Sequence, residues 1–438
     1  MTTVAPADLQ TGITLGSTGQ RARWSLSPWG AVTPWGQEHP VPLDWYIAAD
    51  DRWHVPAREP TARQERIEGT PVVETRIRIP DGDAVQRVWA VSDMGGIVVL
   101  EFENESPMPF AVALTGPQAV TERPSADVPI QGIELPDDAI VLPVGHRATV
   151  RIALESADVT FPPAALAKIP PALAVVRGWT RVVEQASRLV LPDERLVHAV
   201  VAARCDLLLE GPVDSVNDPV GFLLDVAELV RCGDTADAWL MEIVEPAERV
   251  AKSAARRSVA PDVVGSAVQS LAAARTVAQV AHDDRAAGDI DRMIERIVSR
   301  SSDSDASGGV IASFADVRRA TSVGRFVRSV ERRVVDGGRF LSGGMPTSWL
   351  GNNFEVHGLP TSPSTTVSFA VRWHGERPAV LWEQQGDTPV ELSAPDIDPN
   401  WLTRERSGES LWPAPFGKRT KRSGLQVTVD PDEGTSFV

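Results

Sequence analysis

The chain has 438 residues, of which 42% are hydrophobic and 23% are charged, as in an ordinary globular protein. This length exceeds the size at which a single hydrophobic core stops growing, so we expect two or three packed units. The net charge of -16 argues against a nucleic-acid partner, since binding phosphates requires clustered Lys and Arg, and no apolar stretch approaches the ~20 residues that span a bilayer, so no membrane partner is expected.

Residues 1–160 predict an antiparallel β-sandwich. Hydrophobic and polar residues alternate in short segments bounded by Pro, Gly, Asp or Asn, at 72–79, 85–91, 97–102, 111–114 and 141–154. Residues 16–19, Gly-Ser-Thr-Gly, are interpreted as a hairpin turn rather than as a dinucleotide-binding loop. The first residues lack the basic and apolar segments of an export signal, so a cytoplasmic location is expected.

Residues 172–336 predict a helical-hairpin domain. The hydrophobic spacing indicates helices near 172–190, 193–210, 218–232, 235–257, 261–282, 284–300 and 314–335. Capping side chains lie at or beside helix starts, namely Asp193, Asp218, Thr235, Asp262 and Asp284. The polar segment 301–309 is predicted to be a mobile loop.

Residues 337–416 predict a β-rich C-terminal segment. Alternation at 367–373, the turn at 374–378 and the apolar run at 379–383 indicate a hairpin. Residues 417–438 combine a basic run with acidic residues and predict a disordered tail.

Ten of the thirteen tryptophans fall within two windows, residues 24–53 and 349–412, at opposite ends of the sequence. A cluster of indoles indicates either an aromatic core or an aromatic-lined ligand cleft. We therefore expect the two ends of the chain to meet, with the C-terminal segment packing back on the sandwich and on the helices.

Neither a metal nor a cofactor is expected. Cys205 and Cys232 lie within helical patterns rather than at zinc-ligand spacing, so both are predicted to be free thiols. The pair Asp50-Asp51 is a weak cation candidate, because a bare Asp pair is more often solvated or paired with Arg. The chain contains no G-x-S-x-G elbow, P-loop or H-E-x-x-H motif.

Several segments resemble glycoside hydrolase-like proteins of the six-hairpin glycosidase type. Residues 43–54, 83–88 and 103–107 look like the β-supersandwich domain that precedes an α-helical toroid in these proteins. Residues 219–236 resemble a helix, glycine-containing turn and helix of that toroid, and residues 368–383 are similar to a recurrent C-terminal segment of related bacterial proteins. The resemblance implies an α/α toroid with two catalytic acids on loops at one end of its inner helices. Because the periodicity supports only about seven of the roughly twelve helices of a complete toroid, the toroid here is expected to be partial.

The catalytic candidates are Asp214, Asp218 and Glu383. Glycoside hydrolysis needs a protonated carboxyl and a second carboxylate, and the connection between helices at 210–218 carries three acids, Glu210, Asp214 and Asp218. Asp218 directly precedes Pro219, which equally predicts a helix N-cap. Glu383 follows Trp382, and an indole beside a carboxyl raises its pKa, although an ion pair with Arg372 or Arg377 explains Glu383 equally well. Glu355 and Glu376 are alternative second carboxylates.

The substrate-binding candidates lie in the aromatic C-terminal region: Trp349, His357, Trp373, His374 and Trp382. Indole faces stack on sugars, whereas the two histidines sit beside glycines at turns, where a hydrogen-bonding role is the alternative. The sequence thus predicts a glycosidase-like protein that acts on or binds an oligosaccharide in a cleft between residues 210–218 and 345–360. The alternative is a non-catalytic carbohydrate-binding or scaffolding protein with a degenerate toroid; the oligomeric state cannot be predicted.

Overall fold

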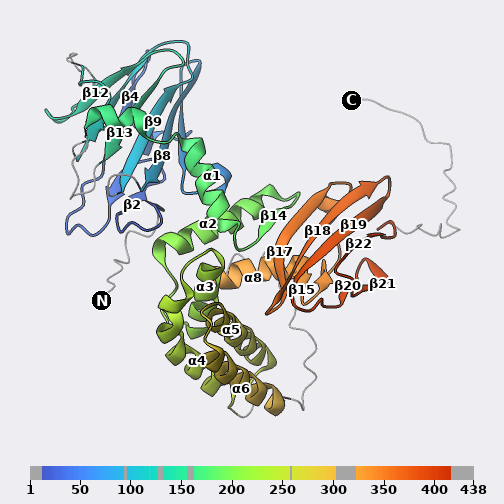
Figure 1. Cartoon of the computed structure of the whole chain (residues 1–438). Coiled ribbons are helices and arrows are strands. Elements are labelled where there is room, and N and C mark those ends of the chain that lie inside the picture. Colours follow the sequence, from blue (N-terminus) through green and yellow to red (C-terminus); the bar gives the residue numbers. More distant parts are fainter. Residues whose placement is uncertain are drawn as a thin grey trace, which may run out of the picture.

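The computed structural model describes residues 12–92, 96–117, 119–126, 132–154, 162–256, 259–301 and 322–415. The chain is an α+β protein, with antiparallel sheets in its N-terminal part, helices in the middle, and largely antiparallel sheets in its C-terminal part (Figure 1). The fold class is confirmed at this level. Apart from Ser301, the predicted mobile loop at 301–309 lies outside the described residues, as does the predicted tail at 417–438.

The N-terminal strands form three sheets. The first has the order β1-β2-β3, with β1 Ile13–Gly16, β2 Arg23–Leu26 and β3 Val32–Pro34. The second has the order β12-β10-β4-β5, with β4 Asp44–Ala48, β5 Trp53–His54, β10 Phe110–Thr115 and β12 Ile140–Val144. The third has the order β11-β13-β9-β8-β7-β6, with β6 Arg63–Arg66, β7 Val73–Ile79, β8 Gly82–Val91, β9 Ile97–Asn104, β11 Ala119–Thr121 and β13 Thr149–Leu154. The predicted hairpin at residues 16–19 is confirmed by the pairing of β1 with β2.

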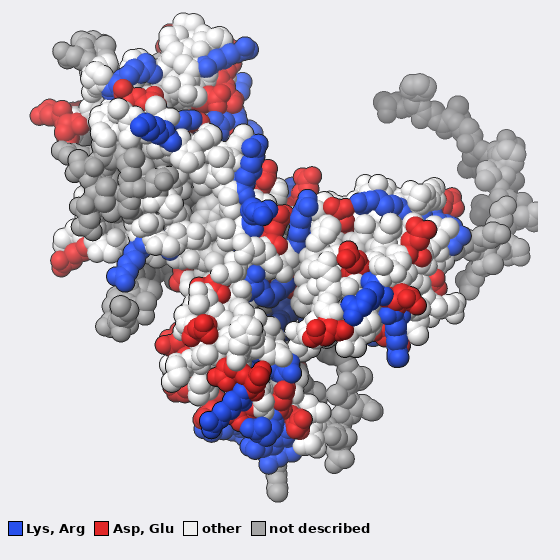
Figure 2. Space-filling model, in the orientation of Figure 1, with Lys and Arg blue, Asp and Glu red and all other residues white. Residues whose placement is uncertain are grey.

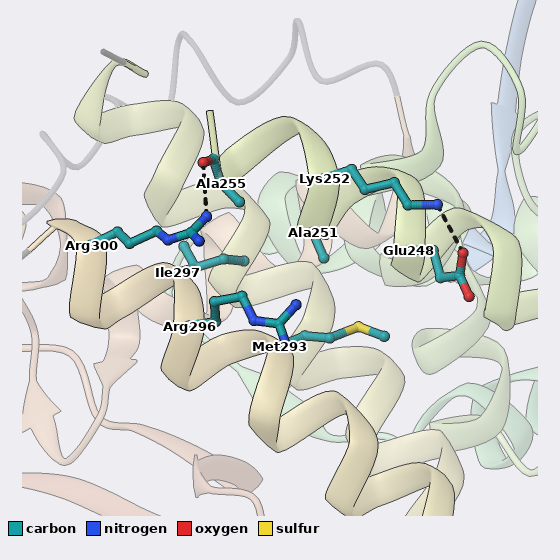
Figure 3. A pocket seen from close by; sticks show the side chains of 8 residues that line it. All are labelled: Glu248, Ala251, Lys252, Ala255, Met293, Arg296, Ile297 and Arg300. Atoms are coloured by element: carbon teal, nitrogen blue, oxygen red, sulfur yellow. Dashed lines mark hydrogen bonds and ion pairs between the residues drawn. The ribbon is translucent and has the colours of Figure 1, made fainter. Parts of the chain in front are cut away.

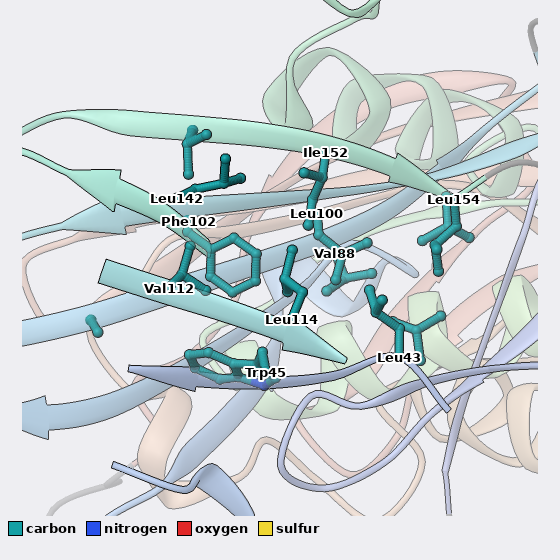
Figure 4. Packing of buried hydrophobic residues seen from close by; sticks show 14 of the residues in the cluster. Leu43, Trp45, Val88, Leu100, Phe102, Val112, Leu114, Leu142, Ile152 and Leu154 are labelled. Carbon is teal, nitrogen blue, oxygen red and sulfur yellow. The ribbon is translucent and has the colours of Figure 1, made fainter. Parts of the chain in front are cut away.

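The apolar faces of these sheets share one core. Trp45 of β4 lies between them with its ring centroid 5.4 Å from that of Phe102 on β9, and aliphatic side chains from β8, β10, β12 and β13 surround the pair (Figure 4). Hydrophobic and polar residues alternate in the sequence because every second side chain of a strand points to the same face, and here one face lines the core.

The five helices predicted from 193–210 to 284–300 are found close to their predicted bounds, whereas residues 314–321 of the helix predicted at 314–335 lie outside the described residues. The helices are α1 Ala172–Val183, α2 Glu194–Glu210, α3 Pro219–Arg231, α4 Leu240–Ala254, α5 Pro261–Val280, α6 Asp284–Ser301 and α8 Val323–Val334. Short 3-10 helices precede α1, at Pro163–Lys168, and α4, at Ala236–Trp239. Among the helices described here, none is long and apolar enough to cross a bilayer.

The C-terminal strands form two sheets. One has the order β14-β17-β18-β19-β22, with β14 Arg188–Val190, β17 Phe354–Ser362, β18 Thr365–His374, β19 Arg377–Gly386 and β22 Ser407–Leu411. The other has the order β15-β16-β20-β21, with β15 Val335–Asp336, β16 Arg339–Phe340, β20 Leu392–Ala394 and β21 Asp398–Thr403. The predicted hairpin is confirmed as β18 and β19. The end of the helix predicted at 172–190 is wrong, because residues 188–190 form β14 and pair with β17.

The prediction that the two tryptophan groups meet is also wrong. Trp24 and Trp45 belong to the N-terminal core, whereas the buried tryptophans of the second group belong to a separate C-terminal core: Trp349, Trp382, Trp401 and Trp412. Figure 1 shows the N-terminal and C-terminal sheets on opposite sides of the helices. The C-terminal core does pack back on the helices, since it includes Val200 of α2 and Val327, Val330 and Val334 of α8.

The N-terminal sheets meet the helices along α1, which shares a core with β8, and along α2. Gly69, with a φ of 76°, lies so close to this helix that a Cβ there would be 2.3 Å from the carbonyl oxygen of His198. The Arg23 guanidinium also donates a 2.9 Å hydrogen bond to the carbonyl oxygen of Leu209 near the end of α2. These contacts fix the position of the N-terminal sheets against α2.

Candidate functional site

A hollow of about 320 Å³ opens between the C-terminal half of α2, the middle of α3 and the start of α8. Its lining residues are Ala203, Asp206, Leu207, Glu210, Gly211, Val213, Asp225, Ser322, Val323 and Phe326. We call it the α2–α8 hollow. The volume is at the lower end of the range of small-ligand sites, about 300–1,000 Å³. Three of the lining side chains are carboxyls, and each is held by a different part of the fold.

Asp206 and Glu210 lie one turn apart on α2. The Arg66 guanidinium, at the end of β6, forms a 2.7 Å ion pair with Asp206. The Thr14 hydroxyl of β1 donates a 2.5 Å hydrogen bond to Glu210. Both carboxyls are therefore oriented by the N-terminal sheets, while α2 supplies their spacing.

Asp225 lies on α3 and is only 1% exposed to solvent. One carboxyl oxygen accepts a 3.1 Å hydrogen bond from the backbone N–H of Val213, and the other accepts a 2.6 Å bond from that of Gly324. Asp225 thus ties the α2–α3 connection and the start of α8 to the wall of the hollow.

Two glycines allow α8 to approach α3 closely enough for these bonds. A Cβ on Gly324 would lie 2.4 Å from the carbonyl carbon of Leu224, and a Cβ on Gly221 would lie 3.0 Å from the Cβ of Ser322. Ser322 caps α8 by accepting a hydrogen bond from the Arg325 N–H. The close approach of α3 and α8 therefore depends on Gly221 and Gly324, which lie near the starts of the two helices.

Burial raises the pKa of two of the three carboxyls. For Asp206, desolvation outweighs the lowering effect of the Arg66 guanidinium, and the neighbouring Glu210 adds to the rise. For Asp225, desolvation outweighs the backbone donors. The hollow consequently contains acids that hold a proton at a higher pH than ordinary carboxyls do.

Asp214 and Asp218 lie on the connection beside the hollow but do not line it. Asp214 is exposed and accepts hydrogen bonds from the N–H groups of Val216 and Asn217, at 2.9 and 2.8 Å. Asp218 is the N-cap of α3, accepting a 2.9 Å bond from Gly221, and it forms a 2.5 Å ion pair with Arg325. Both acids therefore shape the local backbone.

Glu383 lies on the C-terminal sheet, away from these two acids. It is exposed on β19, whereas the preceding Trp382 points into the core on the opposite face, so the indole does not desolvate this carboxyl. The expected partners of Glu383 are engaged elsewhere. The Arg372 guanidinium bonds Glu355, and the Arg377 guanidinium donates to the carbonyl oxygens of Leu411 and Trp412.

The predicted aromatic subsites are mainly structural. Trp349 and Trp382 are buried, and the Trp382 indole N–H donates to the Glu405 carbonyl oxygen. Trp373 is half-buried and donates to the Asn352 carbonyl oxygen at 2.9 Å.

The two histidines are exposed on the same sheet. His357 lies 3.4 Å from a Glu355 oxygen, and His374 ends β18. None of the five binding candidates lines the α2–α8 hollow. In the pair Asp50-Asp51, the weak cation candidate, Asp51 lies 3.0 Å from the His54 ring. The described residues contain no group of three or more His, Cys, Asp or Glu side chains that could bind a metal ion.

Of the three carboxyls of the hollow, Glu210 belongs to the acid-containing connection noted in the sequence, whereas Asp206 and Asp225 were not predicted. Asp206 and Glu210 look like ordinary polar positions of an amphipathic helix. Asp225 did carry a signal, because it interrupts the apolar run from Phe222 to Val230, and an acid within such a run is buried and needs donors.

A second group of charges is fully interior, between α2, α3 and α8. Arg204 bonds Glu228 at 2.7 Å and Glu331 at 3.0 Å, and Arg231 bonds the same two carboxyls at 2.7 and 2.8 Å. The Ser187 hydroxyl, just before β14, donates to Glu331 at 2.6 Å. The direct ion pairs between two guanidiniums and two carboxyls tie the three helices together.

A scan against models of protein families found no match to this chain, and a search of curated proteins found no similar sequence.

Proposed function

We propose that this chain binds a carbohydrate or a related polyhydroxylated ligand in the α2–α8 hollow, without a catalytic role. The observation that carries the proposal is the convergence of Asp206, Glu210 and Asp225 on one hollow of small-ligand size. Carboxyl oxygens accept hydrogen bonds from sugar hydroxyls, and each has more acceptor positions than its protein partners use.

The carboxyls are oriented before any ligand arrives, which lowers the entropic cost of binding. Arg66 and Thr14 hold the two acids of α2, and the backbone donors hold Asp225. Phe326 and Val323 supply apolar surface at the start of α8. This combination of a few polar groups with apolar walls is the usual composition of a ligand site.

One observation favours a glycosidase as the second candidate. The Asp206 pKa is raised, as a general acid requires, and Glu210 lies one helical turn away. Residues four apart on a helix are neighbours on its surface, so the Asp206 and Glu210 carboxyls both line the hollow from the same face of α2. A partial α/α toroid built from the hairpins of α1 to α8 remains part of this candidate.

The experiment is a thermal-shift screen of the chain against mono- and oligosaccharides and simple polyols. A ligand that binds the native state raises the melting temperature, and Glu210→Gln and Phe326→Ala should weaken that shift. Asp214→Asn is the matched control, because Asp214 lies on the same connection outside the hollow. No shift with any sugar, or equal loss in the control, would contradict the proposal.

The same samples separate binding from hydrolysis. Each sugar that shifts the melting temperature is incubated with the protein, and new reducing ends are measured. We expect none. Release of reducing ends that stops in Asp206→Asn, with the thermal shift retained, would establish the glycosidase instead.

A further inference from the structure

A second concave surface lies far along the helices from the hollow. It is a groove of about 350 Å³ between α4 and α6, lined by Glu248, Ala251, Lys252, Ala255, Met293, Arg296, Ile297 and Arg300 (Figure 3). We call it the α4–α6 groove. The C-terminal halves of both helices line it, and both helices also pack against α5.

The floor of the groove is apolar and shallow. Ala251 lies on α4 and Ala255 is the C-cap of the same helix one turn later, and Met293 and Ile297 lie one turn apart on α6. Alanine leaves the helix backbone close to the surface, so a third helix can approach. Methionine adapts its shape to different apolar partners.

The rim of the groove is cationic. Lys252 is paired with Glu248 at 3.0 Å, and the Arg300 guanidinium donates to the Ala255 carbonyl oxygen at 3.2 Å. Figure 3 shows Arg296 reaching from α6 toward α4 beside Met293. Within the described part of the chain, no carboxylate lies at ion-pair distance from Arg296 or Arg300. Figure 2 shows Lys and Arg mixed with Asp and Glu over the helices at the bottom of the molecule. Within a protein of net charge -16, Arg296 and Arg300 therefore give the groove a local excess of positive charge.

We propose that the α4–α6 groove binds an acidic amphipathic helix of a partner protein. The apolar stripe of that helix, at i, i+3 or i+4 and i+7, lies on the alanine and methionine floor. Its Asp or Glu side chains meet Arg296 and Arg300, which sets its orientation and excludes basic helices. The proposal concerns a site separate from the α2–α8 hollow and does not depend on it.

The first test measures whether the groove is open. Ala251→Cys introduces a thiol on the floor, while Cys205 and Cys232 are buried and burial raises the pKa of both thiols, so they react slowly. We expect iodoacetamide to label the introduced thiol rapidly in the native full-length chain. A thiol as unreactive as the two native ones would show that the chain itself covers the groove, which overturns the proposal.

The second test uses a designed peptide of about 15 residues with leucines on one stripe and glutamates elsewhere, a length at which helices become marginally stable in water. Fluorescence anisotropy of the labelled peptide gives Kd. We expect the peptide to bind and to protect the Ala251→Cys thiol, and the version with lysine in place of glutamate not to bind. Equal binding of both versions, or no binding of either, would overturn the proposal.

Charge-reversal variants test whether the peptide binds at the α4–α6 groove. Arg296→Glu and Arg300→Glu should each raise Kd by about fivefold or more, since an exposed ion pair is replaced by repulsion. Arg285→Glu is the matched control, because it makes the same change on α6 at the end away from the groove. An equal loss in the control would assign the effect to overall charge. Self-association in sedimentation, abolished by Arg296→Glu, would assign the groove to a second copy of the chain instead.

Discussion

At Gly324 a missing side chain decides how two helices pack. The residue starts α8, and its backbone lies against Leu224 of α3 at a distance that leaves no room for a Cβ. The hydrogen bond from its N–H to buried Asp225 depends on the same approach. Gly324 therefore determines both how closely α8 packs against α3 and the shape of the α2–α8 hollow at that point.

Gly324→Ala should destabilise the protein by about 1–3 kcal/mol, because the added carbon forces α8 away from α3. Gly178→Ala in α1 is the control, since nothing lies within 4 Å of a Cβ there. That change should stabilise by roughly 0.5–1 kcal/mol through the helix preference of alanine. Urea unfolding of both variants checks the pair, and equal effects would contradict the close-packing argument.

Asp218 has two roles that substitutions can separate. Asn caps a helix about as well as Asp but cannot form the ion pair with Arg325. Asp218→Asn should therefore cost less than about 1 kcal/mol, as is usual for a partly exposed ion pair, and Asp218→Ala about 1–2 kcal/mol. Denaturant unfolding measures both. If Asn proved as costly as Ala, capping would not be the main role.

At the scale of elements, local pattern predicted most of the fold. Strands with one buried face alternate, and helices with one buried stripe show a repeat near 3.6 residues, so β18, β19 and α2 to α6 could be located from the sequence. The pairing of strands that are far apart in the sequence produces no comparable periodic pattern. β14 has only three residues and joins β17 across the whole helical region, so the sequence around 188 indicated a continuing helix.

The same limit applies to the candidate site. Its residues come from β1, β6, α2, α3 and α8, and their convergence is a tertiary property. The sequence did draw attention to the connection 210–218, because it carries three acids between two helices, and this connection adjoins the α2–α8 hollow. It could not show that Trp382 points into a core while Glu383 faces solvent, since either face of an isolated hairpin can be the buried one.

The two faces of β19 provide a direct comparison. Trp382 packs edge-on against Trp401 at 5.4 Å in the C-terminal core, so Trp382→Ala should cost about 3–5 kcal/mol. Glu383→Ala, one residue further along, should change stability by no more than about 0.5 kcal/mol. Thermal or urea unfolding measures both. A large effect of Glu383→Ala would indicate a role that its exposure does not explain.

The interior charges of α2, α3 and α8 predict a pH dependence. The two neighbouring guanidiniums and the Ser187 hydroxyl outweigh desolvation and lower the Glu331 pKa from 4.5 to about 2. A lowered pKa means that the stability contributed by Glu331 is fully present above its unfolded pKa and is lost as pH falls from about 4.5 toward 2.

Glu331→Gln should remove this part of the acid dependence. At neutral pH it should cost about 3–5 kcal/mol, because buried Arg231 and Arg204 lose a counter-charge. Urea unfolding between pH 3 and pH 7 gives both quantities. An unchanged slope of stability against pH below 4.5 would contradict the assignment.

At the scale of the whole molecule, α2 joins the N-terminal sheets to the rest of the chain. It carries Asp206 toward Arg66 on one side and Val200 toward the C-terminal core on the other. One helix thus contacts both sets of sheets, and its C-terminal half lines the α2–α8 hollow.

A double-mutant cycle of Arg66→Ala and Asp206→Ala tests this coupling. Groups in direct contact usually show interaction energies between about 0.5 and 3 kcal/mol. We expect a value in that range and a single unfolding transition for the sheets and helices together. Zero coupling with two separate transitions would mean that the N-terminal sheets fold independently of α2.

The pairing of β14 with β17 also has a consequence for synthesis of the chain on the ribosome. Leu189 emerges long before its partner Val356, with all of α2 to α8 made in between. At ordinary translation rates the wait is on the order of 10–30 s. During that time β14 has no sheet to join and the apolar side chains of α2 that later cover the C-terminal core, such as Val200, face solvent. The newly made N-terminal half is therefore the form of this protein that most needs a chaperone.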